Sequence, residues 1–163
     1  MKKWVISIPM STYRIVVDAD ACPVKQEIIQ AAKLYQASVL MVASYDHRLQ
    51  VSEGVETIQV DRSDQSVDLY IANRICAQDI LVTQDFGLAT IGLAKRAIVL
   101  SPRGQQYTDE TIDFLLDRRH TQAKQRRSGK HSKGPKPFTE EDRQIFQHKL
   151  TKVLRNLQEN VSL

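Results

Sequence analysis

"YRIVVDADACPVKQEIIQAAKLYQ", residues 13–36, decides the fold of this chain. The run at 13–19 is apolar at consecutive positions, a pattern typical of a strand buried on both faces of a parallel sheet. Pro23 suits the first turn of a helix, where a missing N–H costs nothing, and apolar residues then recur at helical spacing up to residue 36. The stretch therefore predicts a buried strand followed by a helix that packs on it.

The rest of the chain repeats this alternation of strand and helix. Because parallel strands need crossover connections, the alternation predicts a three-layer α/β fold with a mainly parallel central sheet of about five strands and helices on both faces. The further predicted strands are 38–44, 55–60, 79–85 and 97–100, and the further predicted helices are 63–77, 86–96, 109–120 and 139–160.

The length of the chain favours a single domain spanning 1–163. Within it we expect an N-terminal extension or the start of a strand at 1–12 and a basic loop at 119–138. The last segment, 139–160, is predicted to be a helix packed on the domain.

The composition gives no membrane signal. No apolar run approaches the roughly 20 residues that cross a bilayer. The apolar part of the first 12 residues is about five long and is interrupted by Pro9, which is too short for a signal peptide. We therefore expect a cytoplasmic protein without a membrane partner. Cys22 and Cys76 have no metal-ligand spacing, and both are expected to be buried free thiols.

Positive charge is concentrated in one segment. The net charge is +4, but residues 118–138 contain eight Lys or Arg and no Asp or Glu. Such a segment favours an anionic partner, and contact with a nucleic-acid backbone, RNA ahead of DNA, is the predicted use. A solvated, flexible loop is the alternative. The predicted phosphate-binding residues of this segment are Arg118, Arg119, Lys124, Arg126, Arg127, Lys130 and Lys133.

Carboxylates gather at predicted strand ends. Asp18 and Asp20 follow the first strand, Asp85 follows the fourth, and Asp64 and Asp68 lie one turn apart on the helix before it. Ligands of open parallel sheets bind at the carboxyl edge, and the alternation of an extended chain sends Asp18 and Asp20 to the same side. Crowded carboxylates raise one another's pKa unless a cation binds. Mg²⁺ or Mn²⁺ is the predicted cofactor, and the alternative is that each acid is a loop residue or a helix cap.

Four further residues near these strand ends have two interpretations each. Lys25 is either a phosphate contact or a solvated lysine, and Thr83 either positions a water or metal ligand or caps its strand. Ser101 and Arg103 resemble a phosphate-holding turn, since arginine offers a bidentate fork. The alternative is that Arg103 pins the loop to the C-terminus of a helix.

Five motifs together resemble the YaiI/YqxD family of bacterial proteins, from about Tyr13 to near the C-terminus. They are VDADACPVK (17–25), DQSVDLYI (64–71), VTQDFGLA (82–89), SPRGQQYT (101–108) and GPKPFTEEDRQIF (134–146). That family resembles the PIN-like nucleases in fold, which implies a PIN-like domain here.

PIN-like enzymes hold Mg²⁺ or Mn²⁺ with acids after the first strand, on a middle helix and after the fourth strand. By position the resemblance implies Asp18, Asp68 and Asp85, with Asp20 and Asp64 as further candidates. The family often has a glycine-led GxDxxD before the helix. Here Ser63 and Asp64 precede Asp68 with a different gap, which puts Asp64 in more doubt than Asp68.

The sequence thus predicts a divalent-metal-dependent nuclease that hydrolyses RNA or DNA phosphodiesters with a metal-activated water. The alternatives are a non-catalytic nucleic-acid-binding module and a phosphatase for a small phosphorylated substrate. The oligomeric state stays open, a homo-oligomer included. The predicted catalytic residues are Asp18, Asp20, Asp68 and Asp85.

Overall fold

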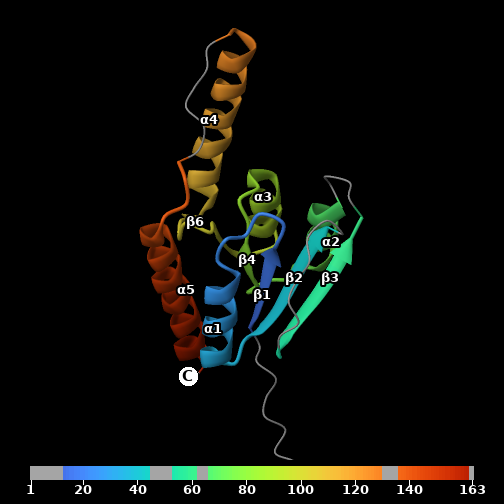
Figure 1. The fold of residues 1–163 in the computed structure, drawn as a ribbon, viewed down its shortest axis with the longest axis vertical. Coiled ribbons are helices and arrows are strands. Elements are labelled where there is room, and N and C mark those ends of the chain that lie inside the picture. The colour runs from blue at the N-terminus through green and yellow to red at the C-terminus, as the bar shows by residue number, and fades with distance from the viewer. Residues whose placement is uncertain (1–12, 45–52, 62–65, 130–135, 162–163) are drawn as a thin grey trace, which may run out of the picture.

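A computed structural model of the chain describes residues 13–44, 53–61, 66–129 and 136–161. The strands are β1 (Arg14–Asp18), β2 (Ser38–Ser44), β3 (Val55–Val60), β4 (Ile80–Val82), β5 (Ile98–Leu100) and β6 (Gln106–Tyr107). They form one sheet in the order β3-β2-β1-β4-β5-β6, parallel except for the antiparallel pair of β5 and β6 (Figure 1). The predicted α/β fold is confirmed. The sixth strand was not expected because two residues are too few to show a strand pattern.

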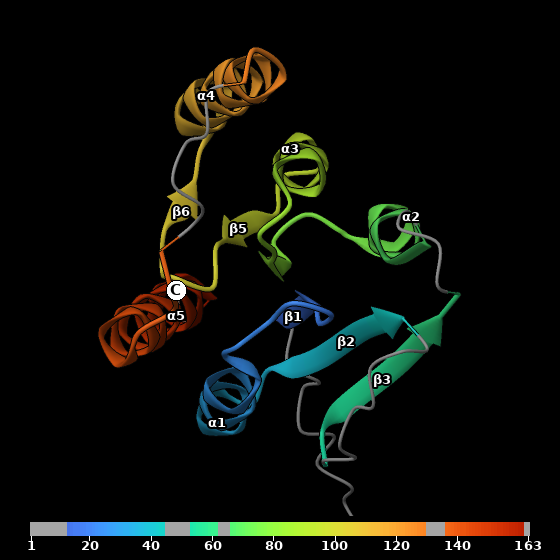
Figure 2. The ribbon, with the colours of Figure 1, turned by 45° about the horizontal axis from the view of Figure 1, so that its top comes forward.

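Helices cover both faces of the sheet. They are α1 (Lys25–Tyr35), α2 (Ser66–Arg74), α3 (Phe86–Ala94), α4 (Asp109–Arg127) and α5 (Glu140–Val161). Figure 2 shows α1 and α5 on one side of the sheet and α2, α3 and α4 on the other. No helix in the described part of the chain is long and apolar enough to span a bilayer.

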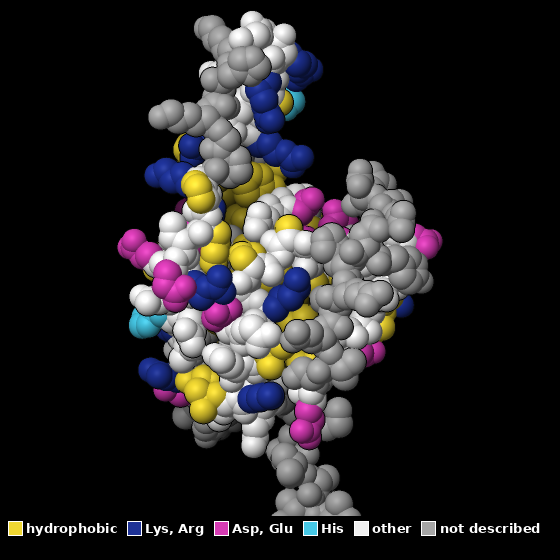
Figure 3. Space-filling view, in the orientation of Figure 1, with side chains coloured by type: hydrophobic (Ala, Val, Ile, Leu, Met, Phe, Trp, Pro, Cys, Tyr) yellow, Lys and Arg dark blue, Asp and Glu magenta, His cyan; other side chains and the backbone are white. Residues whose placement is uncertain are grey.

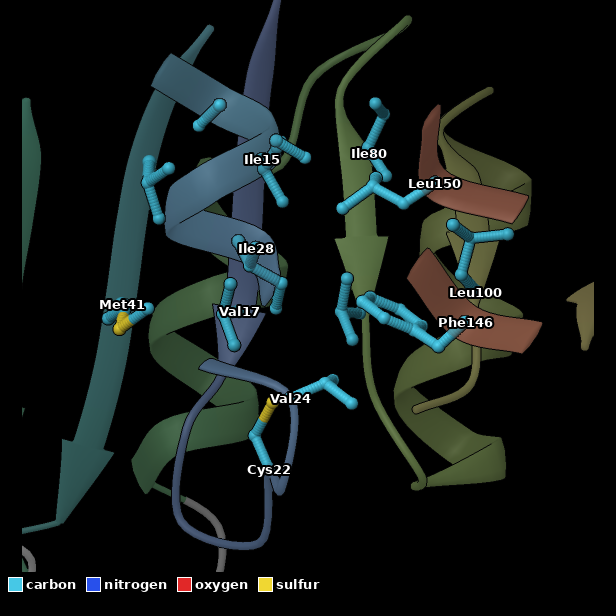
Figure 4. Close-up of a cluster of buried hydrophobic side chains, with 14 of the residues drawn as sticks. Ile15, Val17, Cys22, Val24, Ile28, Met41, Ile80, Leu100, Phe146 and Leu150 are labelled. Carbon is cyan, nitrogen blue, oxygen red and sulfur yellow. The ribbon is translucent and has the colours of Figure 1, made fainter. Parts of the chain in front are cut away.

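The sheet has a hydrophobic core on each face, and the central strand β1 contributes side chains to both. Its apolar residues are consecutive for this reason. Side chains alternate along a strand, so Ile15 and Val17 pack in the core beneath α1 and α5, while Val16 packs in the core beneath α2 and α3. Figure 4 shows Ile28 of α1 and Phe146 of α5 on the first of these cores. α1 begins at Lys25, later than the predicted Pro23, because residues 23 and 24 form a turn.

The predicted basic loop at 119–138 is wrong over its first part, because α4 continues to Arg127. Residues 119–127 are rich in Gln, Ala, Lys and Arg, which are good helix formers, and the bases of the last turn suit the helix dipole. Thr108 begins the helix with a capping box, and Gly129, with φ +83°, follows its end. The distal half of α4 projects beyond the carboxyl edge of the sheet (Figure 1).

The turn after β5 holds the start of α5. Nη1 of Arg103 lies 2.6 Å from Oδ2 of Asp142, and the same guanidinium donates to the carbonyl of Lys136. Gly104 has φ +86°, and a Cβ there would lie 2.8 Å from Cγ2 and 3.0 Å from the carbonyl carbon of Ile145. Only glycine fits this close approach without displacing α5.

The cysteines have different environments. Cys22 is buried beneath α1, as predicted. The prediction for Cys76 is wrong, because this residue is exposed in the turn after α2, where its thiol donates to the carbonyl of Arg74 at 3.3 Å.

Candidate functional site

The ends of β1 and β4 meet through Thr83. The two strands pair in parallel with Val17 opposite Val82, so the residues that follow are neighbours at the carboxyl edge. Oγ1 of the buried Thr83 donates to Oδ2 of Asp18 at 2.9 Å and accepts from the backbone N–H of Asp85 at 3.0 Å. One hydroxyl therefore links the two strand-end acids that the sequence predicts as metal ligands.

Asp85 is the N-cap of α3. Its Oδ1 accepts from the N–H of Leu88 at 2.9 Å, and its backbone is extended, as the cap position requires. The cap orients the carboxylate toward the first turn of α3. A Cβ at Gly87 would lie 3.1 Å from Oδ1, so the glycine leaves room for the carboxylate.

Asp68 approaches the same place from the first turn of α2, where it lines a cavity together with Asp85. The pKa of Asp68 is raised to about 6, mainly by burial and further by the negative charges of Asp85 and Asp18 and a hydrogen bond with Asp85. Burial likewise raises the pKa of Asp18, a rise that the Thr83 hydrogen bond opposes and the charges of Asp20 and Asp85 reinforce. Asp18, Asp68 and Asp85, hereafter the aspartate cluster, thus act on one another electrostatically.

Asp20 lies beside the aspartate cluster but is held differently. Its Oδ1 accepts from the N–H of Ser44, at the end of β2, at 2.8 Å, whereas Asp18 bonds toward β4. The premise of the prediction that Asp18 and Asp20 point to the same side does not hold. It requires an extended chain through residue 20, and the strand ends at Asp18, before a turn at 20 and 21. Asp20 acts on Asp18 through its charge.

Two of the weaker candidates have structural contacts. Ser101 is buried, and its hydroxyl accepts from the N–H groups of Arg103 and Gln105 at 3.3 and 3.1 Å. The guanidinium of Arg103 is bound to the start of α5. Arg103 therefore pins the turn to a helix, but to the start of α5 and not to a helix C-terminus as the alternative stated. Lys25 is partly buried at the start of α1.

The basic residues follow α4 rather than a loop. Arg118, Arg119, Lys124, Arg126 and Arg127 are all exposed on this helix, and Figure 3 shows Lys and Arg side chains along its projecting part. Lys130, Lys133 and Asp64 lie outside the described residues.

Tyr107 was not predicted as a site residue. Its ring is buried edge-on against Phe86, with the centroids 6.0 Å apart. Burial and the charge of Asp85 raise the pKa of Tyr107 to about 12, so this hydroxyl keeps its proton near the aspartate cluster. Cys22 is no nucleophile, because burial raises the pKa of its thiol to about 11. No sequence signal for Tyr107 exists, since its proximity to Asp85 depends on the pairing of β6 with β5.

Comparison with known proteins identifies the family of this chain. A family model described as "Uncharacterized BCR, YaiI/YqxD family" matches residues 16–156, a span that contains the aspartate cluster and most of α5. This chain belongs to the YaiI/YqxD family. The predicted resemblance is thereby confirmed.

Several relatives share most of their length with this YaiI/YqxD protein. A UPF0178 protein of Bacillus pumilus is 50% identical over 143 residues, which cover 87% of this chain and 86% of the relative. UPF0178 proteins of Bacillus velezensis and Listeria monocytogenes are each 47% identical, and their matches cover 96% and 88% of this chain and 94% and 96% of the relatives.

Among solved structures, a crystal structure of Rae1 (YacP) from Bacillus subtilis matches with a TM-score of 0.40 and 14% identity. The match covers 93% of this chain and 99% of that one. The PIN-like relationship of this YaiI/YqxD protein stays a prediction.

The chemistry of the aspartate cluster fits a hard divalent cation. Among the described residues, no group of three or more His, Cys, Asp or Glu side chains is arranged to hold a metal ion as the side chains stand. Mg²⁺, however, takes one or two carboxylates directly and keeps several waters. Two of the three acids could supply those ligands, because the negative charges of Asp18, Asp68 and Asp85 lie close enough to act on one another.

Proposed function

We propose that this protein is a divalent-metal-dependent nuclease of the cytoplasm that hydrolyses phosphodiesters of single-stranded RNA, with DNA as the second substrate to test. The proposal rests on the aspartate cluster at the carboxyl edge of the sheet and on the basic helix α4, which projects from the same edge.

One observation carries the proposal. Asp18, Asp68 and Asp85 come from three separate segments, and the charge of Asp85 raises the pKa of both of the others. In the part of the chain that the structure describes, no Lys or Arg forms an ion pair with any of the three. Carboxylates brought together without a counter-charge destabilise the fold, and a bound cation is the simplest compensation.

The residues have distinct roles in this proposal. Asp85 and Asp18 would hold Mg²⁺ or Mn²⁺, with Asp68 completing the site directly or through a water. When bound, such an ion supplies a water nucleophile at neutral pH and neutralises charge on a phosphate. The hydrogen bond from Thr83 orients Asp18 and lowers its pKa, against the rise that burial causes. Asp20 adds negative charge beside the site.

The basic side chains of α4 are the reason to propose a nucleic-acid partner. Its five exposed Lys and Arg side chains at residues 118–127 offer a phosphate-binding surface without base-specific geometry. Contacts of this kind position a strand and make binding dependent on salt.

Asparagine variants of Asp18 and Asp85 test the proposal. Asparagine caps helices as well as aspartate does, and an asparagine at residue 18 can still accept from Thr83, so both variants keep the fold while losing a charged ligand. We expect Mn²⁺-stimulated cleavage of single-stranded RNA to fall on the order of a hundredfold or more in each. The matched control is Asp113→Asn, an exposed aspartate on α4 that should cleave like the wild type.

Calorimetry and a substrate panel separate the remaining functions. Unchanged cleavage in both variants would contradict the proposed nuclease function. Salt-sensitive RNA binding without Mn²⁺ binding at millimolar concentration would indicate a non-catalytic binding module. Hydrolysis of small phosphate monoesters in place of RNA would indicate a phosphatase, since the same acids serve that chemistry.

A further inference from the structure

An apolar slot adjoins the aspartate cluster between α2 and α3. Its volume is about 250 Å³. Two of its lining residues are Asp68 and Asp85, so one end of the slot is part of the candidate metal site. The other lining residues, all without polar side-chain atoms, are Leu69, Ala72, Gly87, Leu88 and Ile91.

Two of the three large aliphatic side chains that line the slot face solvent, and the third, Leu88, is buried. Leu69 on α2 is 58% exposed and Ile91 on α3 is 38% exposed. A single exposed leucine is ordinary on a protein surface, and Leu34 on α1, 73% exposed, is such a residue. Leu69 and Ile91 differ from Leu34, because they line one cavity together with two ionisable groups of the candidate site.

The walls of the slot are held together. Lys95, the C-cap residue of α3, donates from Nζ to the carbonyl of Ala72 on α2. The N-cap bond from Asp85 to the N–H of Leu88 fixes the other end of α3. The slot is therefore formed before any ligand binds, which lowers the entropy cost of binding.

We propose that this slot binds one nucleobase of the strand whose phosphate lies at the aspartate cluster. The inference rests on the proposed function and names a subsite for its substrate.

Chemistry and size select a base over other parts of a nucleic acid. The slot has aliphatic walls and only acidic polar groups, so a phosphate would be repelled inside it, whereas the apolar face of a base would be buried. Its volume lies below the roughly 300–1,000 Å³ of sites for larger ligands, which suits a single ring system. None of the described residues that line the slot has an amide, hydroxyl or cationic side chain, so the subsite should accept different bases with little sequence preference.

Methyl NMR of the wild-type protein tests binding without any need for catalysis. A short single-stranded RNA is titrated with Mg²⁺ present, beside an RNA of equal length in which every base has been removed. We expect the Leu69 and Ile91 methyl resonances to shift with the base-bearing strand only. The Leu34 methyl resonances should shift with neither strand. Equal shifts with both strands, or no shift with either, would overturn the subsite.

Serine variants test its use in the reaction. Leu69→Ser combined with Ile91→Ser should weaken binding and cleavage of the base-bearing strand about tenfold, the order expected when a base loses apolar contact with two aliphatic side chains, and leave the base-free strand unaffected. Leu34→Ser is the matched control, because it also replaces an exposed leucine by serine. Since both slot residues are exposed, the double variant should fold.

Failure of the subsite and failure of the nuclease give different results. If Asp85→Asn abolishes cleavage while the double serine variant loses nothing, or loses equally on both strands, the nuclease stands and the subsite is wrong. If Asp85→Asn cleaves like the wild type but the methyl shifts need bases, the slot binds a base in a protein that is not this nuclease.

Discussion

Thr83 and Asp18 are joined by a hydrogen bond of 2.9 Å between Oγ1 and Oδ2, across a separation of 65 positions in the chain. The same Oγ1 accepts from the N–H of Asp85 at 3.0 Å. This buried hydroxyl therefore sets the relative position of two acids at the candidate site. It also lowers the pKa of Asp18 against the burial that raises it.

Thr83→Val removes both bonds with little change in shape. It leaves an acceptor of Asp18 and a backbone donor of Asp85 without their partner, and each loss costs roughly 1–3 kcal/mol when the group is buried. We expect the free energy of unfolding, measured by urea denaturation near neutral pH, to fall by about 2 kcal/mol. Metal-stimulated cleavage should weaken as well, because Asp18 becomes harder to ionise.

Thr90→Val is the matched control for this substitution. Thr90 is exposed on α3 and donates to the carbonyl of Phe86 within its own helix. Its loss should change stability by less than about 0.5 kcal/mol. Equal effects of the two substitutions would mean that the hydroxyl of Thr83 has no special role.

Asp68 should make stability depend on pH. Its pKa is raised from an ordinary 3.8 to about 6 in the folded protein, so between these values the folded state holds a proton that the unfolded chain has released. This contribution to stability is complete below the unfolded pKa and is lost as pH rises through about 6. Asp68→Asn should therefore be more stable than the wild type above pH 6 and equal to it at acidic pH.

The size of this effect is limited because Asp68 is partly exposed and its interactions are screened by solvent. We expect a rise of about 3 °C in the melting temperature of Asp68→Asn near neutral pH, measured by calorimetry. Added Mg²⁺ or Mn²⁺ should reduce the gap, because a cation stabilises the ionised carboxylates of the wild type. A gap that persists unchanged from acidic to neutral pH would contradict the assignment.

The fold could be predicted from the sequence because each parallel strand is a consecutive apolar run and each following helix has apolar residues at helical spacing. β1 and β2 are the clearest cases, since both are buried on both faces. The helical continuation through 121–127 was missed because charge and a following Gly-Pro segment outweighed helix propensity in the prediction. Propensity decides that stretch, since its side chains are exposed and no packing competes.

The candidate site was predicted only in outline. Strand order places Asp18 and Asp85 together, because acids after neighbouring parallel strands share an edge. The link through Thr83 depends on register, which no local pattern contains. The apolar slot had a signal that the prediction did not use. Residues 86–94 carry apolar side chains around most of the helix, so an exposed position such as Ile91 requires an explanation beyond the core.

Gly104→Ala should destabilise the junction of the β5 turn with α5. A residue with a Cβ is strained at φ +86°, and that Cβ would overlap the backbone of Ile145. We expect the free energy of unfolding, measured by urea denaturation, to fall by about 3 kcal/mol. Gly129→Ala is the matched control, because Gly129 has φ +83° and no atom within 4 Å of the added Cβ. It should cost about 1 kcal/mol, and a similar cost at both glycines would show that Ile145 moves aside freely.

Three bases at the projecting end of α4 should set RNA affinity and its dependence on salt. Lys124, Arg126 and Arg127 are replaced together by glutamine, a good helix former that keeps α4 intact. Each phosphate contact in a single strand contributes about 0.7 to the slope of log affinity against log salt, so the slope should fall by about 2. Filter binding across a salt series measures both quantities. Lys152→Gln with Arg155→Gln, exposed on α5, lowers the net charge by two against three and should leave the slope unchanged. Equal losses in the two variants would mean that net charge, rather than α4, attracts the strand.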